Sequence, residues 1–340
     1  MRKSLRGILE NHCKLFALKY SKLSVRKILQ HNHYMLVFGD SAIWGQGLLD
    51  RHKYSYIVEK DIRDNYTRGD VKRLVFAHSG AKIGIHDHKV KKPLPGEVNV
   101  GHPTILQQIN AFTGLKKTVK LILVNGGIND VKVNTILNPL KSNDSLKKDI
   151  DKYCHIHLKM LLKKIIKEYP NSKIIVTGYF PVISSSSNLF HVNLIFSALD
   201  LLKILPLNYL APYLFDRIIK RWKIFYKRST KKMKQTVDEV HREINSSQRQ
   251  VFFINPMFLP KNSVHASDPW LFGINRNGTP KDSIAVKRRH ECESAKAKAG
   301  FNTVELKICK LASVGHPNKK GALEYAKAIT PLAVSLAVGK

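Results

Sequence analysis

Acidic residues and cysteines are both scarce in this chain. Only 25 Asp and Glu stand against 58 Lys and Arg in 340 residues, which gives a formal charge of +33. Such a charge favours contact with anionic partners, whether phospholipid headgroups, nucleic acid or acidic polymers, and says nothing about fold. The four cysteines form no C-x-x-C pair, which argues against a zinc ribbon or a thioredoxin-like motif. Cys292 and Cys309 could form a disulfide or stay reduced, and the missing export signal favours reduced thiols.

Residues 1–30 lack the apolar core and the small-residue cleavage site of a standard secretory signal. They carry eight Lys or Arg and one Glu, with apolar residues at roughly helical spacing. We therefore expect a basic amphipathic helix. It could pack on the domain with a solvated basic face, lie on an anionic membrane, or serve as an organellar transit segment. The expected location is cytoplasmic or peripheral to a membrane, with export and organellar targeting left open.

Five short apolar runs recur along the remaining chain, residues 31–340. Runs of this kind are typical of strands buried on both faces of a parallel sheet. Between the third and fourth run, residues 145–170 repeat apolar side chains at i, i+3 and i+4 and end in proline, which predicts a crossover helix. The alternation predicts an α/β three-layer sandwich around a central parallel five-stranded sheet. The predicted strands span residues 35–41, 72–79, 120–127, 173–180 and 250–256.

The fourth and fifth runs are separated by roughly 70 residues, more than one crossover needs. The segment of about 184–235 begins apolar and ends basic, with nine Lys or Arg and no acid between residues 217 and 234. Prolines and charged residues interrupt its apolar part, so no stretch reaches the length of a transmembrane helix. We expect a helical insertion, either packed as core helices or serving as a lid or membrane-facing surface. The proline-broken apolar helices beside a basic stretch favour the second alternative.

Polar residues follow the first three predicted strands and recur near the C-terminus. Ser41 stands in "FGDS", Gly80 in "SGA", Asn129 in "GIND" and His316 in "HPNKKG". The carboxyl ends of parallel strands meet at one edge of the sheet, where ligands bind. Each residue alone is ordinary in a turn. Together they offer a hydroxyl nucleophile, donors for an oxyanion and a base, as acyl transfer requires.

These four blocks, in this order from residue 39 to 321, resemble the SGNH (GDSL-type) hydrolases, a family of esterases and lipases with a flavodoxin-like fold. The resemblance implies that Ser41 is the nucleophile and His316 its base. It implies an oxyanion hole made by the backbone N–H groups of Ser41 and Gly80 and by the Asn129 side chain. It implies no metal and no cofactor, and the "IHDHK" stretch at 85–89 is interpreted as an exposed polar loop.

One departure concerns the third member of the triad. The family's last block usually reads D-x-x-H, whereas Ser313 stands at the acid position here. The Ser313 hydroxyl or a nearby backbone carbonyl could accept the Nδ1 proton of His316, which is the favoured alternative. A remote carboxylate, Asp268 or Asp282, could do so instead. The third alternative is an impaired enzyme.

The resulting hypothesis is a serine carboxylic ester hydrolase acting on lipid or other acyl esters, with peripheral contact to an anionic membrane. Trp44, Trp270 and Phe272 are predicted to contact the acyl chain. Two alternatives are a carbohydrate O-acetyl esterase and a non-catalytic protein that binds membrane or nucleic acid. No nucleic-acid-binding module is recognisable, so no specific nucleic-acid partner is expected.

Overall fold

The computed structural model of the protein describes residues 32–65, 70–86, 94, 96–98, 103–198, 212–244 and 249–338. Its centre is one all-parallel five-stranded sheet, in the order β2-β1-β3-β4-β5. This confirms the predicted α/β sandwich and places its five strands close to the predicted runs. The strands are β1 (Asn32–Phe38), β2 (Asp70–Val75), β3 (Val119–Val124), β4 (Lys173–Thr177) and β5 (Val251–Ile254).

The middle of the sheet is buried on both faces, as near-continuous apolar strands require. Leu36 and Val37 point to opposite faces of β1, and both side chains are fully buried. Ile122 and Leu123 on β3 are likewise inaccessible to solvent. The chain order reverses between β1 and β3, which creates a topological switch point at the carboxyl edge. A ligand site is expected at this edge.

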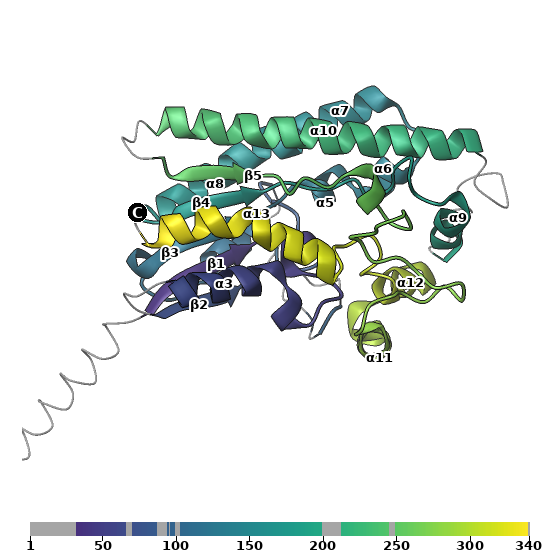
Figure 1. The fold of residues 1–340 in the computed structure, drawn as a ribbon, viewed down its shortest axis with the longest axis horizontal. Coiled ribbons are helices and arrows are strands. Elements are labelled where there is room, and N and C mark those ends of the chain that lie inside the picture. The colour runs from purple at the N-terminus through teal and green to yellow at the C-terminus, as the bar shows by residue number, and fades with distance from the viewer. Residues whose placement is uncertain are drawn as a thin grey trace, which may run out of the picture.

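Helices cover the two faces of the sheet because right-handed crossovers in opposite directions lie on opposite sides. In Figure 1, α3 (Tyr54–Asn65) and α13 (Lys319–Val338) pack together on the near face. The crossovers from β3 to β4 and from β4 to β5 contribute α7 (Asn143–Asp151), α8 (Leu158–Glu168) and α10 (Pro212–Glu243), which pack on one another. The sheet is thereby enclosed between two helical layers.

The predicted crossover helix at 145–170 is interrupted in the middle. A π-helical turn, η3 (Lys152–His157), separates α7 from α8. This turn places the buried Cys154 thiol against Gly127, where an added Cβ would lie 2.9 Å from Sγ. Gly127 has φ +122°, a conformation that L side chains rarely adopt. The π turn therefore lets the crossover pack tightly behind the loop that carries Asn129.

The insertion between β4 and β5 consists of α9 (Leu189–Ala198) and α10 among the described residues. One face of α10 is buried along its whole length, from Leu214 to Val240. Arg221 on that face is 1% exposed and donates to the carbonyl oxygens of Thr135 (2.6 Å) and Ile136 (3.1 Å). α10 therefore packs as a core helix through this face, and the lid or membrane-facing alternative for the insertion stays a prediction. Residues 199–211 and the N-terminal segment 1–30 lie outside the described residues.

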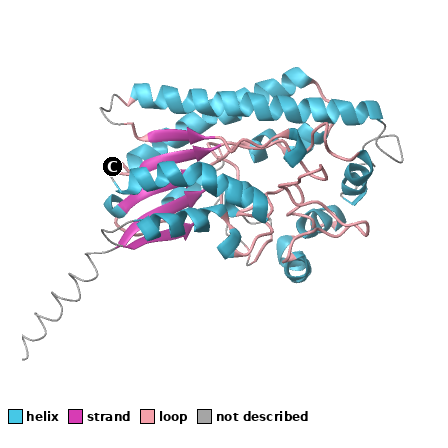
Figure 2. Ribbon diagram, in the orientation of Figure 1, coloured by secondary structure: helices cyan, strands magenta, loops and turns pink. Residues whose placement is uncertain are grey.

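Short helices gather at the carboxyl ends of the strands, to the right of the arrowheads in Figure 2. Among the helices at this end, α11 (Ala285–Ala299) and α12 (Thr303–Lys310) are joined by a disulfide between Cys292 and Cys309. The expectation of reduced thiols is therefore wrong. No helix within the described ranges is long and apolar enough to cross a membrane. The remaining elements are α2 (Ser41–Trp44), η1 (Asp50–His52), α4 (Ile105–Asn110), η2 (Lys116–Thr118), α5 (Ile128–Val131), α6 (Val133–Leu137) and η5 (Pro260–Asn262).

Candidate active site

Ser41 and His316 meet at the carboxyl edge of the sheet, although 275 residues separate them. The Ser41 Oγ lies 2.7 Å from Nε2 of His316. Ser41 occupies the first position of α2, immediately after the turn that leaves β1. That turn requires a glycine, because Gly39 has φ +141° and a Cβ there would lie 2.1 Å from Asn125 Oδ1. The strand-to-helix turn thus presents the serine hydroxyl toward the histidine.

Asp40 fixes this turn through hydrogen bonds of its carboxylate to Ala42, Asn125 and Tyr179. Its Oδ1 accepts the Ala42 backbone N–H at 2.9 Å, which caps the start of α2. Its Oδ2 accepts the Tyr179 hydroxyl at 2.7 Å, and Asn125 Nδ2 donates to Oδ1 at 3.1 Å. Burial raises the pKa of Asp40, and these three hydrogen bonds oppose that rise. The aspartate of the "FGDS" block is therefore a structural cap that joins the ends of β1, β3 and β4.

Gly80 and Asn129 lie on the same cavity as Ser41 and His316. The loop carrying Gly80 is fastened to α5, because Asn129 Nδ2 donates to the Ala81 carbonyl at 3.0 Å. Asp130 Oδ2 accepts the Ile83 backbone N–H at 3.0 Å, and burial raises the pKa of Asp130 to about 6. A side-chain amide has two N–H donors, so Asn129 can hold this loop and still donate to a substrate oxygen.

The loop carrying His316 is fixed by its neighbours. The Phe272 backbone N–H donates to the His316 carbonyl, and Gly315 N–H donates to the Phe272 carbonyl, each at 2.8 Å. Asn318 Oδ1 accepts the backbone N–H groups of Lys320 and Gly321 at 2.9 and 3.0 Å, at the start of α13. The His-Pro-Asn block is thus an ordered turn into the last helix.

The Nδ1 atom of His316 is buried and makes no hydrogen bond within the described part of the chain. Burial, and to a smaller extent the nearby charge of Arg288, lower the pKa of His316 to about 4. The backbone carbonyl groups of Ser313, Val314 and Ala312 act in the opposite direction. The ring is therefore neutral at pH 7.

The side chains proposed as orienters for His316 have other partners. The fully buried Ser313 hydroxyl donates to Asp282 Oδ2 at 2.5 Å and accepts from Arg288 at 3.0 Å. Asp268 lies at the surface in an ion pair with Lys320 at 2.6 Å. Asp282 binds Ser313 and Arg288 rather than the histidine. Neither the Ser313 hydroxyl nor one of these carboxylates is therefore hydrogen-bonded to Nδ1, and a backbone carbonyl as the orienter of His316 stays a prediction.

A cavity of about 300 Å³ opens beside Ser41 and His316 and is mainly apolar. Its far walls come from α6, α9, α10 and α12, so the insertion supplies part of the lining. Sequence reasoning recognised the apolar insertion but named none of the side chains that form these walls. The apolar side chains from these four helices are Val133, Leu137, Ile195, Phe196, Trp222 and Ile308.

The three aromatic residues predicted to contact substrate do not line this cavity. Trp44 stacks on His78 with ring centroids 4.8 Å apart. Trp270 packs edge-on against Phe258, with centroids 5.0 Å apart. Phe272 is 8% exposed and helps to hold the His316 loop through its backbone. The prediction that these three rings line the acyl-chain cavity is therefore wrong, because their loops pack the rings against other residues of the protein.

Comparison with known proteins finds no matching family model and no matching curated protein. Among solved structures, the chain is similar to the extracellular lipase of Streptomyces rimosus, at 14% identity over 90% of this chain and 99% of that one, with a TM-score of 0.46. It is similar to phospholipase A1 of Streptomyces albidoflavus, at 11% identity over 89% and 98% of the two chains, TM-score 0.46. It is also similar to a family 2 carbohydrate esterase of Corynascus thermopiles (Myceliophthora fergusii), at 13% identity over 91% and 67%, TM-score 0.45.

The order of the parallel strands, with its reversal between β1 and β3, is the flavodoxin-like order. The four sequence blocks lie at one edge of this sheet, where the first three follow β1, β2 and β3. The chain thus has the α/β/α fold that its resemblance to the SGNH hydrolases implies.

Proposed function

We propose that this protein is a carboxylic ester hydrolase that uses Ser41 as nucleophile and His316 as base. The observation that carries the proposal is the 2.7 Å contact between Ser41 Oγ and His316 Nε2, beside a cavity that Gly80 and Asn129 also line. Nucleophile and base within hydrogen-bond reach, next to convergent donors, is the arrangement needed for acyl transfer. A protein that only binds membrane or nucleic acid has no need of it.

In the first step, Ser41 Oγ attacks the ester carbonyl while its proton passes to Nε2 of His316. The negative charge on the former carbonyl oxygen is met by the backbone N–H groups of Ser41 and Gly80 and by the Asn129 amide. The intermediate collapses, the alcohol leaves with the proton from His316, and the acyl group remains on Ser41. Water then attacks the acyl-enzyme, gives a proton to His316, and the carboxylic acid is released as Ser41 regains its proton.

The acyl group is proposed to be a hydrocarbon chain rather than acetyl. Side chains from α9 and α10, among them Phe196 and Trp222, bring apolar surface to the cavity beside Ser41. A chain that fills such a cavity gains roughly 0.8 kcal/mol per buried methylene. An O-acetyl ester would leave most of that surface uncovered, so the carbohydrate esterase alternative is the weaker one.

An anionic lipid surface is the proposed setting for the reaction. A second hollow lies next to the first, and Leu311 lines both. Basic side chains line this second hollow: Arg276, Arg289, Lys307 and Lys310. Clustered basic groups beside an apolar cavity suit an ester held at a surface of anionic headgroups.

A fluorophosphonate probe tests the chemistry. Wild-type protein should become labelled, and Ser41→Ala should not. If wild type does not react, the enzyme interpretation is overturned.

A panel of nitrophenyl esters from acetyl to long acyl chains, with acetylated xylan alongside, then tests the substrate class. Phe196→Ala should lower kcat/KM for long chains several-fold and leave acetyl ester hydrolysis nearly unchanged, since only a long chain reaches α9.

Vesicle sedimentation tests whether the protein binds an anionic lipid surface. Wild type should bind vesicles containing a quarter phosphatidylserine and release them as salt rises, because exposed charges are screened. The double variant Arg276→Glu/Arg289→Glu should bind them more weakly. The control is Lys72→Glu/Lys117→Glu, in β2 and η2 at the opposite edge of the sheet, which changes the net charge equally. Equal loss in both variants would show that net charge alone drives binding.

A further inference from the structure

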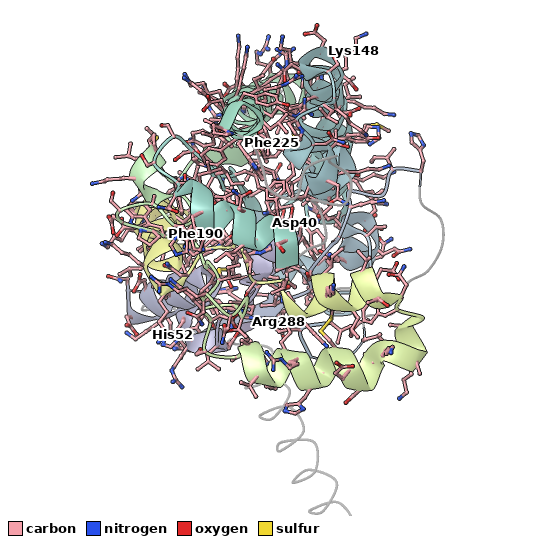
Figure 3. All side chains as sticks on the ribbon, turned by 90° about the vertical axis from the view of Figure 1, so that its right-hand side faces the viewer. Asp40, His52, Lys148, Phe190, Phe225 and Arg288 are labelled. Atoms are coloured by element: carbon pink, nitrogen blue, oxygen red, sulfur yellow. A yellow bond between two sulfur atoms is a disulfide. The ribbon has the colours of Figure 1, made fainter. Side chains whose placement is uncertain are left out.

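A buried ion cluster lies directly behind the His316 loop. At its centre is Arg288 of α11, whose side chain is 0% exposed. Its guanidinium donates to Asp282 at 2.6 Å, to Glu97 at 2.8 Å and to the Ser313 hydroxyl at 3.0 Å. Its Nε donates to the Lys310 carbonyl at 3.1 Å. Figure 3 shows Arg288 on α11 close to the disulfide that joins α11 to α12.

One arm of the cluster reaches the loop that carries the base. Ser313 is held from two sides, because its hydroxyl accepts from Arg288 and donates to Asp282 at 2.5 Å. The Ser313 carbonyl in turn accepts the His316 backbone N–H at 2.9 Å. Moving Arg288 would therefore release the turn that sets the direction of the imidazole.

The other arm reaches the loop that follows the nucleophile. Glu97 accepts the Gly47 backbone N–H at 3.0 Å and Gln46 Nε2 at 2.9 Å. The Gln46 backbone N–H donates to the Ser41 carbonyl at 3.2 Å. The two loops also touch directly, since a Cβ on Gly47 would lie 2.6 Å from the Ser313 Cβ. The cluster thus spans from the Ser41 turn to the His316 turn.

We propose that Arg288 is a positioning residue of the esterase reaction, which fixes the Ser41 turn relative to the His316 loop where the family's usual carboxylate is replaced by Ser313. The inference rests on the proposed function. Arginine suits this task because its planar guanidinium presents five donors in a rigid fork, whereas the single ammonium of lysine cannot reach three partners in fixed directions. Its hydrogen bonds to Asp282 and Glu97 are charge-assisted and buried, which makes them strong and directional.

The role is one of geometry rather than of charge. The positive charge of Arg288 opposes protonation of His316 and lowers its pKa, whereas a triad carboxylate would raise it. Removing the charge alone should therefore make His316 more basic. A fall in kcat that accompanies a rise in the pKa of His316 is a signature that loss of an ordinary triad acid would not give.

The experiment compares two buried arginines with the same kinds of partner. Arg73 on β2 binds Glu59 at 3.2 Å, Asp50 at 2.5 Å and the Ser55 hydroxyl at 3.3 Å, with its side chain 7% exposed. The variants are Arg288→Lys and Arg288→Met, with Arg73→Lys and Arg73→Met as controls. Each is assayed for kcat and KM on the nitrophenyl ester that wild type cleaves best, and is corrected for the folded fraction.

Histidine NMR provides a readout that needs no turnover. The His316 resonance is assigned with His316→Gln, and its pKa is followed in wild type, Arg288→Met and Arg73→Met. We expect Arg288→Lys to lose on the order of 100-fold in kcat with little change in KM, because a misplacement of about 1 Å costs that much. We expect Arg288→Met to raise the pKa of His316, and both Arg73 variants to leave kcat and this pKa at the wild-type values.

The outcomes separate the inference from the proposed function. A wild type that neither hydrolyses esters nor reacts with fluorophosphonate overturns both. An active wild type in which folded Arg288→Lys keeps its kcat overturns the positioning role and leaves the esterase intact. The same holds if Arg73 and Arg288 variants lose activity equally. If Arg288→Met does not fold, Arg288→Lys decides the question by kcat.

Discussion

The lowered pKa of His316 makes the pH dependence of the proposed esterase activity a direct test of the site geometry. The perturbation is a fall in pH from 8 to 4. Burial lowers the pKa of His316 to about 4, against an ordinary value of about 6.5. At pH 5.5, an ordinary histidine would be only about one-tenth neutral, whereas His316 would remain almost entirely neutral and able to act as a base. Most of the activity at pH 7 should therefore persist at pH 5.5.

The assay is kcat/KM for a soluble ester between pH 4 and pH 8, because this quantity reports the groups of the free enzyme. The acid limb should have an apparent pKa well below 6.5. Asp130, whose pKa burial raises to about 6, could contribute a limb of its own. Asp130→Asn removes that contribution and is the matched control. A limb near 6.5 that survives in Asp130→Asn would refute the reasoning, since it would mean that a carboxylate or water reaches Nδ1 of His316.

The lowered pKa of His316 also makes the free energy of unfolding depend on pH. Between pH 6.5 and about pH 4 the unfolded chain binds a proton at this histidine and the folded chain does not. The free energy of unfolding therefore falls as pH falls through this window, by up to about 3 kcal/mol from His316 below it. His265, whose pKa burial also lowers to about 4, contributes in the same direction. Urea unfolding of wild type and His316→Gln at pH 7 and pH 4.5 separates the contribution of His316 from that of His265.

Three further changes test the site and its support. Ser313→Asp should lower kcat rather than raise it, because the new carboxylate would crowd Asp282, which lies 2.5 Å from the present hydroxyl; a gain in rate would show that the site lacks an acid. Asn129→Ala should cost on the order of 100-fold or more in kcat with little change in KM, as loss of an oxyanion donor does, and an unchanged kcat would remove the residue from the oxyanion hole. Replacing Cys292 and Cys309 by alanine removes a link between residues 17 apart and should lower the free energy of unfolding by about 3 kcal/mol. Calorimetry would show this as a lower Tm. An unchanged Tm would mean that the disulfide does not contribute to the stability of α11 and α12.

The order of elements was predictable because local chemistry dictates it. Strands buried on both faces must be apolar throughout, and this made the five runs visible in the sequence. The first three chemical blocks follow from the same logic, since each comes after a strand and parallel strands end at one edge. His316 follows no strand, and only the resemblance of its block to the SGNH hydrolases made it a foreseeable partner of Ser41 across 275 residues.

What the sequence left open depends on contacts between distant segments. Neither the disulfide between α11 and α12 nor the place of Ser313 could be predicted, because both depend on how α11 folds back behind the His316 loop. Arg288 has no motif around it and gains its partners from three separate segments. The rings of Trp270 and Phe272 could equally have faced a substrate, and only the packing of their loops decided that they do not.

The sequence by itself determined the sheet, the edge at which the chemistry lies, and the side chains that meet there. It could do so because strand burial and strand ends leave a local pattern. The tertiary structure decided what surrounds the base: a buried Nδ1 that has no hydrogen-bond partner among the described residues, an arginine cluster behind the His316 loop, and an apolar cavity with walls from the insertion. These features arise from side chains brought together by folding, and no local pattern records such neighbours.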